Sequence, residues 1–291
     1  MNLRQIRKKI RAVSNVKKIT NAMQLVSAIK MKKAQQKAIE GKPYREVLSF
    51  IIHKVVESLS LEGKKYSPLL SKSNSSAEKD LVILITSNKG LCGSFNFNLF
   101  RFLVKEFDFK KVDFITIGTK GALFVKKMGG IIIADFSSSY EEDKVSAIFK
   151  TTFGSFLKGE YATVFLVYNS FLSPVKFQPK KQIIFPIKVD KESQIDIKEK
   201  KAIKKDYLIE PSPEKIINSA LKNIIELEIY GALIESEAAE HSARMMAMKN
   251  AADNASDVIY NLTLLRNKVR QEKITYELLD MVTAKQSVDI S

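Results

Sequence analysis

The chain has few of the residues that usually build chemical sites. Among its 291 residues are one cysteine, Cys92, two histidines, His53 and His241, and no tryptophan. A single cysteine excludes a disulfide within the chain and fits a reducing compartment. It also leaves no set of thiolates for a structural zinc site. No apolar run approaches about 18 residues, so we expect no segment that inserts directly into a bilayer.

A catalytic arrangement is also missing from the sequence. Cys92 has no histidine beside it that could act as its base, which argues against a nucleophile. His241 lies within an apolar helical pattern, where a packed or register-setting histidine is a simpler interpretation than a ligand. The nearby methionines, Met245, Met246 and Met248, favour packing over a cofactor site. We therefore predict no catalytic residue, no cofactor and no metal site.

Acidic residues are scarce near the N-terminus. The first 40 residues contain one acid, Glu40, and the whole chain has a formal net charge of +16. Such a charge predicts an acidic partner, either nucleic acid, anionic lipid or an acidic protein surface. A transit peptide can have this basic composition, but the pattern continues unbroken past residue 35 into a long helix, which favours mature structure.

Residues 1–57 are predicted to form one long helix. Its apolar side chains recur at steps of three and four, so they are expected to line one face. Within "GKPY" at 41–44, Pro43 predicts a kink. A polar linker is expected over residues 58–79. The residues of the predicted apolar face are Leu3, Ile6, Ile10, Val13, Val16, Ile19, Met23, Val26 and Ile29.

Residues 80–205 have a different pattern. "DLVILI", "VDFITIG", "GIIIADF" and "YATVFLVY" read as strands, and helical segments are expected at 94–107, 119–128 and 141–158. Strands that alternate with helices predict an α/β domain with a parallel sheet. The prolines in residues 174–187 confine a further strand there to the sheet edge.

The stretch "LVILITSNKGLCGSFNFNLF" at 81–100 resembles the start of a nucleotide-binding unit, with Ser94 as a candidate helix cap. A phosphate loop needs GxxxxGK[ST], and a dinucleotide site needs GxGxxG. Neither pattern is present, because Gly90 and Gly93 give GxxG alone. We favour a tight strand–helix turn over a phosphate site.

A second long helix is predicted within residues 206–291, with Ser212 as its cap and Pro213 at its first position. A seven-residue apolar repeat runs from Ile217 to Leu262, interrupted at Gly231 and His241. Such a repeat is typical of a coiled coil. The N-terminal helix is its simplest partner. The sequence therefore predicts an α/β protein with long terminal helices, which form an antiparallel two-helix coiled coil around an inserted α/β domain.

Four segments of the chain resemble one known family. "IRKKIRAVSNVKKITNAMQLVSAIKMKKAQ" at 6–35 resembles the amino-terminal helix of the gamma subunit of rotary F-type ATP synthases. "NKGLCGSFNFNLF" at 88–100 is similar to that family's central motif. "ESEAAEHSARMMAMKNAADNASDVI" at 235–259 and "NKVRQEKITYELLDMV" at 267–282 are similar to its carboxyl-terminal helix. The four segments occur in family order and span nearly the whole chain.

The resemblance implies a non-catalytic rotor subunit of the proton-translocating synthase. The terminal helices would form a shaft inside a hexamer of alternating alpha and beta subunits, and the beta subunits would hold the catalytic sites. The inserted domain would be Rossmann-like, without a nucleotide, and would rest on the epsilon subunit and the membrane c-ring. Two unequal helices are not threefold symmetric, so the shaft would bias each beta subunit toward a different conformation.

The resemblance also assigns candidate contacts with beta subunits. Met23 and its basic neighbours would face an acidic beta-subunit loop, with the "GLCG" loop near the same region. Arg244 lies in an "ARMxAMKxAxxN" segment, and a further group lies where the helix meets beta-subunit catch loops. The predicted contact residues are Lys17, Lys18, Met23, Cys92, Arg244, Arg270, Gln271, Thr275 and Glu277.

Two other functions stay open from the sequence. A basic coiled coil could bind nucleic acid through its Lys/Arg stripe, although that stripe lacks interleaved aromatic residues. A nucleotide-dependent enzyme is a third interpretation. For location, a start without an extension favours peripheral attachment at the cytoplasmic face of a bacterial plasma membrane over an organellar inner membrane.

Overall fold

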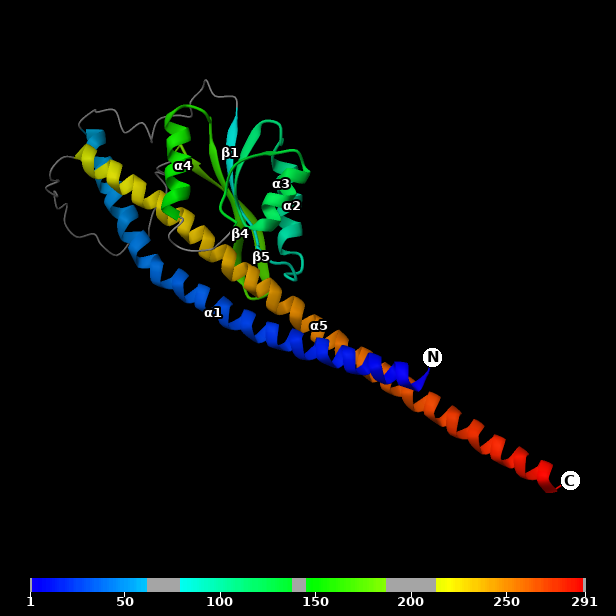
Figure 1. Ribbon diagram of the computed structural model, residues 1–291. Helices are drawn as coiled ribbons and strands as arrows, with labels where there is room; N and C mark the ends of the chain where they lie inside the picture. Colours follow the sequence, from blue (N-terminus) through cyan, green and yellow to red (C-terminus); the bar gives the residue numbers. More distant parts are fainter. Residues whose placement is uncertain (1, 62–78, 138–144, 187–212, 290–291) are drawn as a thin grey trace. The chain divides into compact units, whose positions relative to one another are not determined.

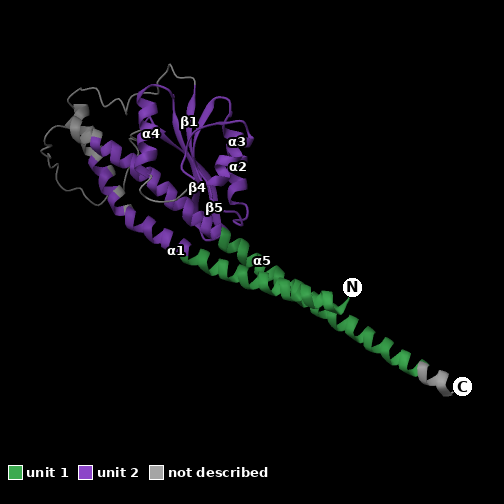
Figure 2. Ribbon diagram, viewed as in Figure 1, with its two compact units in different colours: residues 1–29, 244–291 green, residues 30–243 purple. Residues whose placement is uncertain are grey.

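The computed structural model describes residues 2–61, 79–137, 145–186 and 213–289 (Figure 1). The chain divides into two compact units (Figure 2). The first unit comprises residues 1–29 and 244–291, and the second comprises residues 30–243. Within each unit, segments of the two terminal helices lie side by side and run in opposite directions.

The terminal helices are α1 (Leu3–Leu61) and α5 (Pro213–Asp289). Helix α1 continues past the predicted end at residue 57 and through Pro43 without ending there. Helix α5 begins at Pro213, as predicted. The predicted cap Ser212, most of the predicted linker and the charged segment at 188–205 lie outside the described residues.

The second unit contains one five-stranded sheet in the order β3-β2-β1-β4-β5. Strands β1, β2, β3 and β4 are parallel, and β5 pairs antiparallel with β4 at the edge. This arrangement confirms the predicted parallel sheet and its proline-containing edge strand. The strands are β1 (Asp80–Ile85), β2 (Val112–Ile117), β3 (Ile131–Asp135), β4 (Val164–Ser173) and β5 (Lys176–Phe185).

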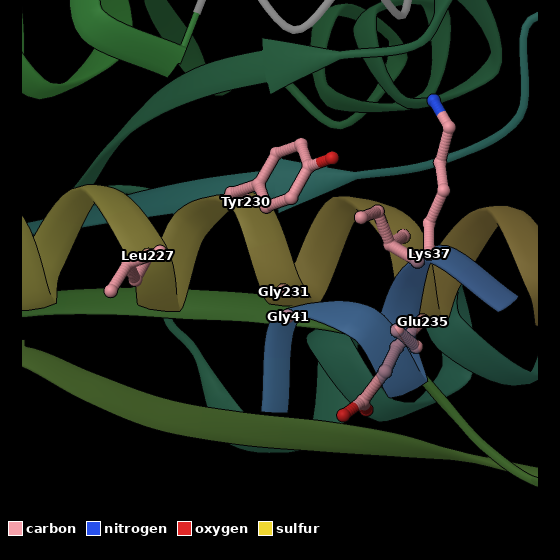
Figure 3. A pocket seen from close by; sticks show the side chains of 8 residues that line it. Lys37, Gly41, Leu227, Tyr230, Gly231 and Glu235 are labelled. Atoms are coloured by element: carbon pink, nitrogen blue, oxygen red, sulfur yellow. The ribbon is translucent and has the colours of Figure 1, made fainter. Parts of the chain in front are cut away.

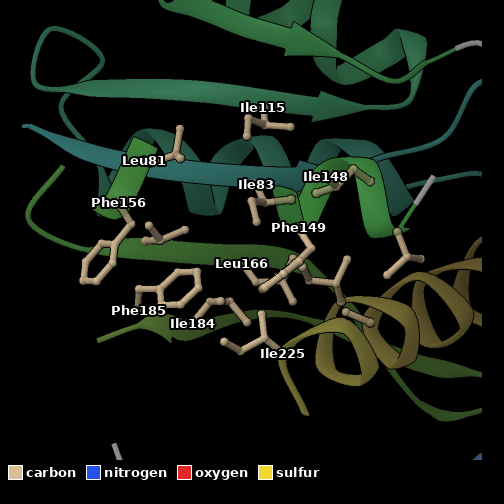
Figure 4. Close-up of a cluster of buried hydrophobic side chains, with 14 of the residues drawn as sticks. Leu81, Ile83, Ile115, Ile148, Phe149, Phe156, Leu166, Ile184, Phe185 and Ile225 are labelled. Carbon is tan, nitrogen blue, oxygen red and sulfur yellow. The ribbon is translucent and has the colours of Figure 1, made fainter. Parts of the chain in front are cut away.

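Both faces of the sheet are covered by helices. On one face, β1 packs with α2 (Phe95–Glu106) and α3 (Thr119–Lys127) through side chains such as Leu84, Leu99 and Val125. On the other face lie α4 (Val145–Leu157) and α5 (Figure 4). A strand buried on two faces consists mostly of apolar residues, which is why β1 reads as an apolar run from Leu81 to Ile85. This is the predicted α/β fold with long terminal helices.

Helix α5 has two buried faces in the second unit. Ile234 and Ala238 pack with Ala34 of α1, on the predicted seven-residue seam. Leu221 and Ile225, which lie outside that seam, pack into the core beneath the sheet. The sequence pattern identified the first face and missed the second, because both faces together leave few exposed positions to define a stripe.

Candidate subunit-contact surfaces

The paired helices of the first unit meet along small and polar residues. On α1 the buried positions include Ile6, Thr20 and Ser27, at multiples of seven residues. The Thr20 hydroxyl donates to the Lys17 carbonyl at 3.0 Å, and the Ser27 hydroxyl donates to the Met23 carbonyl at 2.7 Å. These bonds within one helix satisfy the hydroxyls, so both residues can be buried at little cost.

The apolar face predicted for α1 is therefore partly wrong. Val16, Ile19, Val26 and Ile29 are exposed, although they belong to the predicted stripe. The buried positions of α1 follow the seven-residue series through Thr20 and Ser27, whose hydroxyls gave no hydropathy signal. We call the four exposed residues the outer row. A row of exposed β-branched residues on one helix indicates a surface that another protein covers.

The solvent side of α1 is basic. Lys18 is exposed, and Lys17 and Met23 are half-buried within one turn of residues of the outer row. Basic and apolar side chains thus alternate around the same part of the helix. The other exposed basic residues of this stretch are Arg4, Arg7, Lys8, Lys9, Arg11, Lys30, Lys32 and Lys33.

The far end of α5 has no helix beside it in the first unit. Figure 2 shows α5 continuing past the N-terminus of α1. Every residue from 271 to 283 is exposed, and we call this stretch the tail segment. Because the side chains of a lone helix stabilise it poorly in water, such a segment needs a partner. Its large apolar residues are Ile274, Tyr276, Leu278, Leu279, Met281 and Val282.

Four predicted contact residues lie at or beside the start of the tail segment. Arg270 and Gln271 are exposed, and Thr275 lies one turn beyond them. The Thr275 hydroxyl donates to the Gln271 carbonyl at 3.0 Å. Glu277 forms an ion pair with Lys273 at 3.4 Å between exposed side chains. The structure thus brings these residues together on an open helix surface.

Two other predicted contact residues are buried. The Arg244 residue is 7% exposed in the first unit, and Cys92 is 3% exposed in the second. Cys92 packs with Phe95, Ala239 and Ala243. Side chains this covered are placed to support a neighbouring surface, and the exposed residues beside them are the better candidates for direct contact.

Hydrogen bonds between its own residues and the first turn of α2 stabilise the loop before α2. The Asn96 side chain accepts from the Ser87 amide at 3.2 Å and donates to the Ser87 hydroxyl at 2.6 Å. It also donates to the Cys92 sulfur at 3.4 Å. The predicted cap Ser94 precedes α2, but its side chain makes no capping hydrogen bond. Leu91 has a left-handed backbone with φ 61° and an exposed side chain, a feature that the sequence pattern did not indicate.

A cavity of about 300 Å³ lies between α1 and α5 in the second unit (Figure 3). Gly41 and Gly231 both line it, so each helix lacks a side chain at that point. A Cβ atom added at Gly41 would meet nothing within 4 Å. The cavity is thus a local loss of helix packing. Its other lining residues are Lys37, Ala38, Leu227, Tyr230, Ile234 and Glu235.

A charged cluster adjoins this part of the helix pair. Glu237 lies 3.7 Å from His241 on the next turn of α5. The hydrogen bond from His241 is the main reason that the pKa of Glu237 is lowered, and attraction to Lys37 and Lys30 of α1 adds to it. The His241 side chain is 12% exposed, and its interpretation as a packed or register-setting residue stays a prediction.

Comparisons with known proteins bear on these surfaces. The family described as ATP synthase matches residues 2–288. The ATP synthase gamma chain of Bdellovibrio bacteriovorus is 33% identical over 99% of this chain and 99% of its own length. The chain belongs to the ATP synthase gamma-chain family. The gamma chain of a Janthinobacterium species is 34% identical over 98% of this chain and 99% of its own.

Solved structures share the gamma-chain fold. A chain of the Euglena gracilis mitochondrial ATP synthase has a TM-score of 0.66 and 18% identity, covering 98% of this chain and 94% of that chain. A chain of a mitochondrial ATP synthase central-stalk and c-ring structure from Tetrahymena thermophila has a TM-score of 0.57 and 22% identity, covering 80% of this chain and 99% of that chain. The family model and the gamma-chain relatives confirm the family resemblance of the four sequence segments, and the solved structures show the same fold. No helix among the described residues of this gamma chain is long and apolar enough to cross a membrane.

Proposed function

We propose that this gamma chain is the central-stalk rotor of an F-type ATP synthase and carries no catalytic residues of its own. The observation that carries the proposal is the tail segment, a single helix with large apolar side chains exposed around it. Because most of the stability of a helix comes from packing, and exposed apolar surface marks interaction sites, we expect other subunits to surround this segment. The family's gamma chains and their central-stalk structures support the same role.

The shaft works through contact geometry. The first unit presents two unequal helices, with basic and apolar rows on α1 and the tail segment on α5. In a near-threefold hexamer of alpha and beta subunits, each beta subunit meets a different part of this surface. Each catalytic site is then biased by differential contact, and rotation exchanges the three roles. The inserted α/β domain is the foot that rests on the epsilon subunit and the membrane c-ring.

Individual contacts need to be weak for such a rotor. An exposed ion pair contributes about 0–1 kcal/mol, which biases an angle without locking it. We assign direct beta-subunit contacts to the exposed or half-buried members of the predicted set, Lys17, Lys18 and Met23 on α1. On α5 the direct contacts are Arg270, Gln271, Thr275 and Glu277. Arg244 and Cys92 act indirectly, by supporting the surface around them.

The bacterial relatives, at 33% and 34% identity, favour a bacterial complex attached peripherally at the cytoplasmic face of the plasma membrane. The comparisons give no support to the alternative prediction of nucleic-acid binding.

Reconstitution tests the proposed function. The full chain is mixed with purified alpha and beta subunits of a bacterial synthase, and the products are examined by native mass spectrometry and an ATPase assay. We expect a complex with one copy of this chain per hexamer and ATPase activity above that of the subunits alone. Separate elution of the chain, together with salt-sensitive retention on DNA, would instead favour the nucleic-acid function.

A further inference from the structure

Helix α5 lies along the α/β domain over residues 220–243 of the second unit, a length of about 35 Å. Its domain-facing residues change character along this length. The first part presents large side chains, such as Leu221, Ile225 and Ile229. The later part presents alanines, including Ala239 and Ala243. Alanines form a smooth surface, so apolar packing alone fixes the position of the helix less firmly there.

Among the described residues, the polar contacts that join α5 to strands β4 and β5 and their turn, beside this apolar stripe, include three hydrogen bonds. The Gln182 amide of β5 donates to Glu228 at 2.6 Å. The Ser170 hydroxyl of β4 donates to Glu235 at 2.9 Å. The third contact is donated by the Ser242 hydroxyl of α5 to the carbonyl of Pro174, in the turn between β4 and β5.

The α5 members of these contacts are spaced by seven residues. Positions 228, 235 and 242 therefore lie on one face, with about 10.5 Å of helix between neighbours. Their partners all come from the β4–β5 hairpin, which lies beside α5 in Figure 1. We call Gln182–Glu228, Ser170–Glu235 and Ser242–Pro174 the register bonds.

Hydrogen bonds are directional, whereas apolar contact is not. A slide of α5 by one turn, about 5.4 Å, would carry all three α5 groups away from their partners at once. The apolar stripe would lose less, because the alanine half would meet similar surface after the slide. The register bonds thus oppose sliding more directly than the apolar stripe does.

We propose that the register bonds lock the α/β domain to α5 against shear. This inference rests on the proposed function, in which the membrane ring drives the α/β domain and the domain must pass that force to the shaft. The residues of the register bonds are positioning residues, which keep the α/β domain and α5 in a fixed register.

The test measures sliding directly in the full isolated chain. Spin labels are placed at Lys126→Cys on α3 and Asn223→Cys on α5, both exposed positions, in a Cys92→Ala background. Pulsed EPR then gives the distribution of label-to-label distances. The triple variant Gln182→Leu, Ser170→Ala, Ser242→Ala should broaden this distribution, with populations displaced by up to about 5.4 Å, one helical turn.

Matched variants separate the lock from general loosening. Ser146→Ala removes the bond of 3.2 Å from α4 to Glu226 at an exposed part of the same interface, and should leave the distribution unchanged. Glu235→Gln keeps an acceptor for Ser170 and should also leave it unchanged. If the triple variant does not fold, Ser170→Ala alone should give a smaller broadening. Distributions of equal width in the register variants and Ser146→Ala would overturn the proposal.

A second measurement relates the lock to rotation. In the complete synthase in vesicles, proton-driven ATP synthesis by the triple variant should fall by at least roughly two- to tenfold, the range that even one of its three lost hydrogen bonds represents. ATP hydrolysis by the complex without its membrane part should be unchanged, because nothing then pulls on the domain. Failure of the unaltered chain to assemble with the alpha and beta subunits would refute the proposed function. Equal EPR distributions in the register variants and the control would refute the lock alone.

Discussion

The outer row of α1 gives the sharpest test of the contact surface. Ile19 is 60% exposed and Val26 is 53% exposed, and their seven-residue separation places them on the same flank of the helix. The double variant Ile19→Ser, Val26→Ser removes apolar surface that the isolated chain does not bury. Fully burying such a side chain contributes about 1.5–3 kcal/mol, so covering the exposed half of each would contribute about 0.8–1.5 kcal/mol.

The two substitutions together should therefore weaken binding of the chain to the alpha and beta subunits by about 1.5–3 kcal/mol, or roughly 10- to 150-fold in affinity. Thermal unfolding of the isolated chain should barely change, because exposed substitutions usually alter stability by about 0.5 kcal/mol or less. The affinity is measured by titrating labelled chain into preformed alpha–beta subunits, and the melting temperature by circular dichroism.

Ile6→Ser is the matched control, because Ile6 lies on the same helix with 0% exposure. It should lower the stability of the isolated chain by about 2–5 kcal/mol, as large-to-small core changes do. The reasoning would be refuted if the double variant melted as early as Ile6→Ser, since the outer row would then be packed within the chain. Unchanged affinity in the double variant would refute the proposed contact itself.

Three further predictions concern other parts of the molecule. Gly41→Ala should stabilise the chain by about 0.5–1 kcal/mol, because the added Cβ meets open space and alanine favours the helix; a lower melting temperature would contradict this. Lys17→Glu with Lys18→Glu should weaken proton-coupled ATP synthesis while the chain still folds, and normal synthesis would argue against electrostatic steering by this helix face. Because Glu237 has a pKa below its ordinary 4.5, it stabilises the fold above that value and loses this contribution as the pH falls further; denaturant titrations down to about pH 3 should show a shallower acid decline for His241→Ala.

The sheet could be predicted from the sequence because the burial of a strand imposes a pattern on consecutive residues. A parallel strand buried on both faces is mostly apolar at successive positions, and β1 satisfies that condition from Leu81 to Ile85, whereas β2 also buries Asp113 and Thr116. The seven-residue apolar repeat predicted which positions of α5 pack against another helix, and Ile234, Ala238 and Met248 of this repeat are buried. Pro213 marked the start of that helix for an equally local reason.

The face of α1 could not be predicted in the same way. Hydropathy ranks Val16 and Ile19 above Thr20 and Ser27, yet the two hydroxyl residues are the buried ones. Their side chains bond to their own helix and are small, so burial suits them once a second helix lies close. The second buried face of α5 and the register bonds depend on residues far apart in the chain. No local pattern identifies such pairs.

These errors follow from the proposed function. A chain that buried all of its apolar residues would leave no apolar surface for the surrounding subunits to contact. In this gamma chain the partner-facing helices keep β-branched and aromatic residues outside, at the outer row and in the tail segment, and place small residues between the helices. A search for apolar stripes in such a sequence finds both sets and cannot separate them, because on the proposed function one set serves folding and the other serves assembly. The misplaced residues of α1 are therefore the ones that we expect to matter most for binding and least for stability.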